Sequence, residues 1–162
     1  MSFEIAKNYL QKIGYEDKIM EFDVSSATVD LAAKALGTEG ARIAKTLSFS
    51  TPSGPILIVT AGDMKIDNAK YKARFSAKAK MLTPIEVNEL IGHSVGGVCP
   101  FGIKDGVKVY LDESLKRFDI IYPACGSSNS AVKLSVPELE IATGKFEWVN
   151  VCREITVQIP NE

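Results

Sequence analysis

Lys45 lies within a β-rich run of the sequence. A lysine removed from water at that position could supply positive charge to a binding or catalytic site. The run ARIAKTLSFS (41–50) reads as a strand, and every second residue from Ile43 to Phe49, Lys45 included, points to the same face. Desolvation on that apolar face would lower the pKa of the lysine unless an anion compensates. Lys45 therefore either serves a site, or lies at the strand entrance with its ammonium reaching water.

A glycine-rich run near the middle of the chain is the second candidate. Its glycines and proline impose an irregular backbone and keep side chains small, so that amide N–H groups can approach a ligand as in an oxyanion hole. The alternative is a β-bulge at a barrel corner, inside a glycine-interrupted strand predicted over 95–111. The residues concerned are Gly96, Gly97, Val98, Cys99, Pro100, Phe101 and Gly102.

A third candidate is the small polar loop CGSSNS (125–130), between two predicted strands. The groups that could meet a ligand there belong to Gly126, Ser127 and Ser128. Short hydroxyl and amide side chains suit polar ligand contacts, and they suit a plain turn equally well.

The segment Lys65–Lys80 carries six basic residues against one acidic residue, with two aromatic residues between them. Such a stripe could contact a nucleic-acid backbone, through Lys70, Lys72 and Arg74 in particular. It could equally be the solvated face of a helix.

Several kinds of chemistry are disfavoured by what the sequence lacks. It has one histidine, His93, no CxxC or HxxxH pair, and no glycine-rich phosphate-binding motif. We therefore expect no metal and no cofactor. The cysteines Cys99 and Cys125 read as small buried hydrophobic residues, although a Cys99 thiol hydrolase remains an alternative that Cys99→Ala would test.

The elements that must position these residues alternate irregularly along the chain. Apolar periodicity and capping signals predict helices over 3–13, 28–36, 67–75, 84–91 and 137–143. Strands are predicted over 20–24, 41–50, 56–63, 118–124, 131–135 and 146–155, and several have links too short for parallel crossovers. The expected class is α+β, with a mixed, mainly antiparallel sheet and helices packed around it.

Composition agrees with one ordinary globular domain spanning residues 1–162. Hydrophobic residues make up 46% and charged residues 24% of the chain, and the formal net charge is −1. No global field would draw such a chain to nucleic acid or membrane. Three widely spaced cysteines argue against a disulfide framework. We expect a cytoplasmic protein without a signal peptide or membrane span.

The ordered combination IAKTLSF, VGGVCPFG and ACGSSNSAVKLSVPEL resembles the YbaK/EbsC family, which includes ProX-type proteins and the editing insertion of bacterial prolyl-tRNA synthetase. The resemblance extends from the first helix to about Trp148. It implies a mixed sheet partly rolled into a barrel, and hydrolysis of mischarged aminoacyl-tRNA, typically tRNA for proline carrying alanine or cysteine.

The resemblance also implies site residues and partners. Lys45, followed by Thr46, matches the family's essential lysine, and Gly96 to Pro100 matches its GxxxP loop. The loop at Gly126 departs from that of the cysteine-specific members, so the amino acid removed stays open. The expected partners are aminoacyl-tRNA and a prolyl-tRNA synthetase. The rival expectation is a non-catalytic module that binds tRNA or a synthetase.

Overall fold

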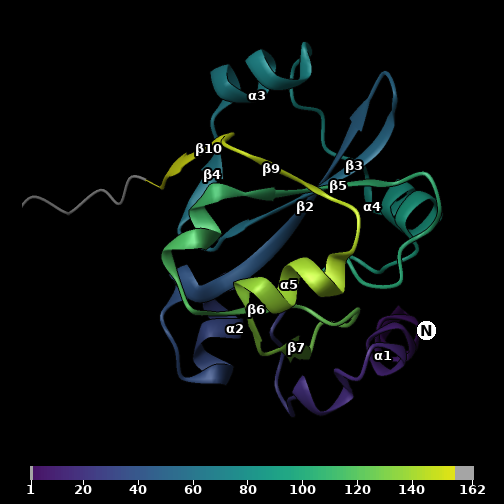
Figure 1. The fold of residues 1–162 in the computed structure, drawn as a ribbon, viewed down its shortest axis with the longest axis vertical. Coiled ribbons are helices and arrows are strands. Elements are labelled where there is room, and N and C mark those ends of the chain that lie inside the picture. Colours follow the sequence, from purple (N-terminus) through teal and green to yellow (C-terminus); the bar gives the residue numbers. More distant parts are fainter. Residues whose placement is uncertain (1, 156–162) are drawn as a thin grey trace, which may run out of the picture.

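The computed structural model describes residues 2–155, which form an α+β fold around a mixed six-stranded sheet in the order β8-β6-β2-β3-β5-β9, curled into a half-barrel (Figure 1). Two separate two-stranded sheets, β1-β7 and β10-β4, accompany it. The strands are β1 (Ile19–Glu21), β2 (Ile43–Thr51), β3 (Gly54–Ala61), β4 (Met64–Ile66), β5 (Lys108–Asp112), β6 (Ile120–Pro123), β7 (Ser130–Val132), β8 (Leu134–Ser135), β9 (Glu147–Val149) and β10 (Cys152–Glu154).

The hairpin of β2 and β3 is the centre of the sheet. The two strands pair antiparallel from Ala44↔Ala61 to Thr51↔Gly54, and the turn between them leaves only Pro52 and Ser53 unpaired. Parallel strands flank the hairpin, since β6 pairs with β2 and β5 with β3. Over residues 2–155 four ladders are antiparallel and three are parallel, but within the six-stranded sheet three of the five ladders are parallel. The predicted mixed sheet is confirmed.

The helices begin where the sequence supplies capping residues. Asp67 accepts a hydrogen bond at the start of α3, and Thr83 and Ser135 form capping boxes with the glutamates three residues later. The helix predicted over 84–91 begins at Pro84 but continues as one π-helical turn over Val87–Ile91. The α-helices are α1 (Ser2–Lys12), α2 (Val29–Leu36), α3 (Asn68–Phe75), α4 (Pro84–Glu86) and α5 (Val136–Thr143), and 3-10 turns cover Glu16–Lys18, Gly40–Arg42 and Glu113–Arg117.

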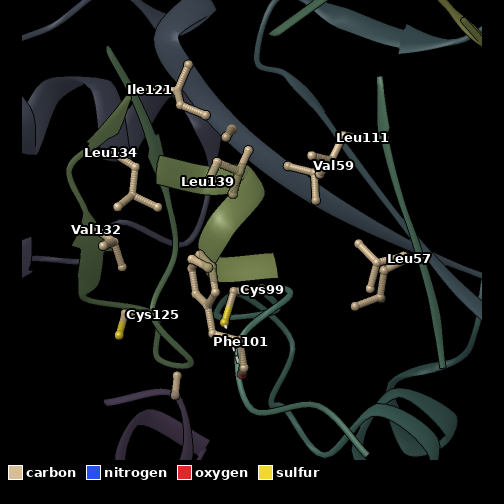
Figure 2. Close-up of a cluster of buried hydrophobic side chains, with 14 of the residues drawn as sticks. Leu57, Val59, Cys99, Phe101, Leu111, Ile121, Cys125, Val132, Leu134 and Leu139 are labelled. Atoms are coloured by element: carbon tan, nitrogen blue, oxygen red, sulfur yellow. Dashed lines mark hydrogen bonds between the residues drawn. The ribbon is translucent and has the colours of Figure 1, made fainter. Parts of the chain in front are cut away.

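Both faces of the central hairpin are buried, so the sheet separates two apolar clusters. Along β3, Leu57 and Val59 belong to the larger cluster, whereas Ile56 and Ile58 belong to the smaller one. Figure 2 shows part of the larger cluster, including Leu139 of α5. The helices α1 and α3 lie at opposite ends of the molecule (Figure 1).

Two predicted strands were placed wrongly. The strand expected over 95–111 exists only from Lys108 to Asp112, because 95–107 is an irregular loop whose glycines adopt positive φ at Gly96, Gly102 and Gly106. The single strand expected over 146–155 is divided into β9 and β10 by Asn150 and Val151, and the two halves pair with different strands.

Candidate functional site

A cavity of about 400 Å³ opens beside β2, where the strand residues 43–48 meet segments distant in sequence. The start of α2 forms one wall, and the segment Met81–Val87 forms another. The glycine-rich loop and the ends of β6 and β7 close it. Of the predicted site residues, those that line this cavity are Lys45, Thr46, Gly96 and Val98.

Lys45 is a half-buried cation at the edge of the smaller cluster. Its Nζ donates a hydrogen bond to the carbonyl oxygen of Met64 on β4. Desolvation lowers the pKa of Lys45, and the neighbouring Cys152 and Asp63 partly oppose that effect. The predicted apolar face is confirmed, since Phe49 is buried and Leu47 packs in the same cluster. An ammonium has three donors, and Met64 takes one of them.

The first half of the glycine-rich loop faces the cavity. Within the described residues, neither the Gly96 nor the Val98 amide donates to a protein acceptor. The next residue, Gly97, packs against the polar loop: the Gly126 amide donates to its carbonyl at 2.9 Å, and a Cβ on Gly97 would lie 2.3 Å from the Ser127 nitrogen. The two loops therefore support each other, and their closest approach requires a glycine.

The second half of the same loop lies in the core and does not line the cavity. Cys99 and Phe101 are fully buried, and Figure 2 shows both within the larger cluster near Leu139. Pro100 is also buried, and a Cβ on Gly102 would lie 2.9 Å from the carbonyl oxygen of Ile5 in α1. These residues anchor the loop to the fold.

Burial argues against a reactive thiol at Cys99. Desolvation raises its pKa far above the ordinary value, so the thiolate that a thiol hydrolase needs is disfavoured. Its sulfur lies 3.7 Å from His93 Nε2, and that nitrogen is already 2.8 Å from the carbonyl oxygen of Phe101. Burial also lowers the pKa of His93, which favours the neutral imidazole. The side chain is held to the glycine-rich loop by its contact with the carbonyl oxygen of Phe101.

For the hydrolysis that the family resemblance implies, we expect Cys99→Ala to keep kcat within about twofold of wild type, because the sulfur does not reach the cavity. Any loss should appear as lower thermal stability, since the substitution removes buried volume. Initial rates and thermal unfolding of the purified variant check this. A loss of most activity in a variant with wild-type melting would restore the thiol mechanism.

Only the end of the loop 125–130 borders the cavity. The rest of this loop supports the surrounding structure. Ser130 lines the cavity, whereas Gly126, Ser127 and Ser128 do not. The Ser127 and Ser130 hydroxyls are hydrogen-bonded at 2.6 Å, and the carbonyl oxygen of Ser128 accepts from the Ser26 amide at 2.6 Å. The polar loop thus connects β7 to the segment leading to α2 through these hydrogen bonds.

The sequence interpretation missed the wall formed by Ser26–Val29 at the start of α2. The local signal was present, because Thr28 caps this helix by accepting from the Leu31 amide. A helix start marks no binding site by itself, and only the folded chain shows that this one faces β2. Tyr122 and Ala124 at the end of β6 were missed for the same reason.

Three residues of the basic stripe, Lys70, Lys72 and Arg74, lie on α3, and no residue of Lys65–Lys80 lines the cavity. Lys70 donates to the carbonyl oxygen of Cys152 at 2.9 Å, and Arg74 pairs with Glu147 at 2.6 Å. Lys72 is exposed, and no salt bridge of the described chain involves it. Two of the three basic residues on α3 are therefore already bound to β9 and β10.

Metal and membrane features can be stated for residues 2–155. No three His, Cys, Asp or Glu side chains in this range gather closely enough to hold a metal ion. None of the helices described there has the length and apolarity needed to cross a bilayer.

The sequence and the fold place this chain in the class of aminoacyl-tRNA editing domains. Residues 24–141 match the family described as aminoacyl-tRNA editing domain, and the chain belongs to that family, the YbaK/ProX family related to the editing domain of prolyl-tRNA synthetase.

Two relatives show similarity over different shares of their length. The chain is 47% identical over 155 residues to the uncharacterized protein YwhH of Bacillus subtilis (strain 168), covering 95% of this chain and 99% of that protein. It is 33% identical over 104 residues to a proline–tRNA ligase of Halalkalibacterium halodurans, covering 64% of this chain but 18% of the ligase.

Solved structures share the whole fold. One, described as a candidate trans-editing enzyme for prolyl tRNA synthetase, superposes with a TM-score of 0.84 at 29% identity, covering 94% of this chain and 97% of that one. The hypothetical protein APE2540 superposes with a TM-score of 0.81 at 25% identity, covering 92% and 99%.

Proposed function

We propose that this chain, as a single editing domain over residues 1–162, hydrolyses mischarged aminoacyl-tRNA in trans, with tRNA for proline carrying alanine or cysteine as the substrate. The observation that carries the proposal is the cavity beside β2, where Lys45 and Thr46 meet Gly96 and Val98 of the glycine-rich loop. The similarity to part of a proline–tRNA ligase and to a candidate trans-editing enzyme supports the choice of tRNA.

The chemistry asks little of the protein, because an aminoacyl ester is already activated by its protonated α-amine. Positioning the ester, a water molecule and one or two oxyanion donors can suffice, each donor contributing about 2.7–4 kcal/mol. In this proposal the Gly96 and Val98 amides supply fixed dipoles. Lys45 turns its ammonium from the Met64 carbonyl toward either the terminal phosphate or the carbonyl oxygen of the ester.

Selectivity is proposed to follow from the size of the cavity. Its lining is largely apolar, with Ile43, Ala44 and Val98 among the residues that a substrate side chain would meet. An apolar wall discriminates one methylene by only about 1–3 kcal/mol. Exclusion of the proline ring, and so protection of the correct product, is therefore steric.

A panel of mischarged tRNAs tests the proposal directly. Purified protein is incubated with tRNA for proline carrying alanine, cysteine or proline, and with tRNA for alanine carrying alanine, and free amino acid is measured. We expect release of alanine or cysteine from tRNA for proline, with the proline ester spared. Binding of these tRNAs without hydrolysis above background would instead support the non-catalytic module.

The contribution of α3 to tRNA binding gives a second prediction. Replacing Lys70, Lys72 and Arg74 by Glu should raise KM and flatten its salt dependence while leaving kcat nearly unchanged, because the three residues would attract phosphates and do not line the cavity. Removing one lysine–phosphate or arginine–phosphate interaction should reduce the salt slope by roughly 0.7–0.9. Deacylation rates at several salt concentrations measure both quantities.

A matched control separates this effect from net charge. Changing the exposed Lys12, Lys133 and Lys145 to Glu makes the same change in charge elsewhere on the surface. Because Arg74 already pairs with Glu147, the single Lys72→Glu variant is measured in parallel as a change that breaks no ion pair. Wild-type KM and salt slope in the α3 variants would show that the basic residues of α3 form a solvated surface and do not bind tRNA.

A further inference from the structure

The wall of the cavity includes a stretch of strand edge that the proposed chemistry leaves unused. Six consecutive residues, Ile43–Ser48, line the cavity. Side chains alternate between the faces of a strand, so consecutive residues can all border one cavity only where it opens on the edge of the strand. The cavity therefore meets the main chain of β2 as well as its side chains.

Hydrogen bonds on either side identify this edge. The carbonyl oxygen of Ser48 accepts from the Leu82 amide at 3.1 Å, and the Ser50 amide donates to the carbonyl oxygen of Lys80 at 2.8 Å. Alternate residues of a strand present their N–H and C=O to the same edge. The N–H and C=O of Thr46 therefore point to the edge away from β3, into the cavity.

This part of the edge is left open by its neighbours. The strand β6 pairs with β2 only at Ile43 and Ala44, and the segment 80–82 covers β2 from Ser48 onward. Within residues 2–155 no protein group bonds to the main chain of Thr46 on this side, and its buried hydroxyl also has no partner. At about 3.3 Å per residue, the gap from Ala44 to Ser48 is roughly 13 Å long.

We propose that the main chain of Thr46 binds the amino acid of the substrate as one added β-residue. The α-ammonium donates to the Thr46 carbonyl oxygen, and the ester carbonyl oxygen accepts from the Thr46 N–H, the two bonds that paired residues exchange in an antiparallel sheet. The inference rests on the proposed function and adds how the substrate is held. A longer peptide does not fit, because β6 and the segment 80–82 block both ends of the gap.

One feature of this arrangement separates recognition of the backbone from selection of the side chain. The pairing involves only groups that every amino acid shares, which leaves the choice of side chain to the apolar walls. A substrate without a free α-ammonium should therefore be rejected whatever its side chain.

The kinetic test compares alanyl-, N-acetylalanyl- and lactyl-esters of the same tRNA, each corrected for its uncatalysed hydrolysis. We expect kcat/KM to fall at least about 100-fold for both analogues, because the Thr46 carbonyl oxygen loses its donor. If the alanyl ester is hydrolysed and the lactyl ester is hydrolysed equally well, the inference is overturned while the proposed function stands.

A binding measurement keeps the inference testable without catalysis. The probe is 3′-alanylamido-3′-deoxyadenosine, titrated into ¹⁵N-labelled protein. The Thr46 amide resonance should shift most, whereas the Lys45 and Leu47 amides, which face β3, serve as internal controls. A Thr46 shift without deacylation of any tRNA would support the inference and refute the proposed function, and saturation that leaves Thr46 unmoved would refute the inference.

Discussion

Lys45→Ala should lower kcat for deacylation of mischarged tRNA by about 10²–10³-fold, the loss expected when one oxyanion donor is removed. The variant should fold normally, because the ammonium is partly desolvated and its only side-chain hydrogen bond within the described residues is to the carbonyl oxygen of Met64. Single-turnover rates and thermal unfolding measure the two effects separately.

Lys65→Ala is the matched control, since it removes an exposed lysine from the neighbouring strand β4. It should retain wild-type rates. The split between kinetic constants also assigns the role of Lys45: a fall in kcat places its charge on the ester carbonyl, and a rise in KM alone places it on the terminal phosphate. A well-folded Lys45→Ala protein with normal kcat and KM would remove Lys45 from the mechanism.

Gly97→Ala should have the second large effect, because it separates the two loops beside the cavity. The new Cβ would lie 2.3 Å from the Ser127 nitrogen and 2.5 Å from the Gly126 carbonyl carbon, so the backbone of one loop must move. We expect a loss of about 1–3 kcal/mol in the free energy of unfolding. A displacement of about 1 Å at Gly96 and Val98 should cost about 10²-fold in kcat.

Gly106→Ala controls for destabilisation alone, since its Cβ meets open space while its φ of +88° is strained for alanine. That variant should lose some stability but keep kcat when assayed well below its melting temperature. For Gly97→Ala, kcat is measured at a temperature where the variant is fully folded. Wild-type kcat under that condition would show that the contact between the loops does not position the site.

Much of the fold was predictable from local sequence. The helix starts at Asp67, Thr83 and Ser135 were readable because a cap and its partner lie within three residues of each other. The central hairpin followed from two β-rich runs joined by a short loop, and the face of Lys45 followed from strand alternation. The position of Lys45 alone did not show whether it serves a site. The resemblance to an editing family indicated that it does.

The sequence by itself thus determined the α+β class, the central hairpin and the apolar face that carries Lys45, because capping and strand alternation are properties of neighbouring residues. Tertiary structure alone decided which half of the glycine-rich loop faces the cavity, since Val98 lines it while Cys99 is buried in the core. It also decided that β6 leaves β2 after Ala44 and so exposes the edge at Thr46. Local sequence does not encode that gap, because it depends on where two distant segments stop pairing with the same strand.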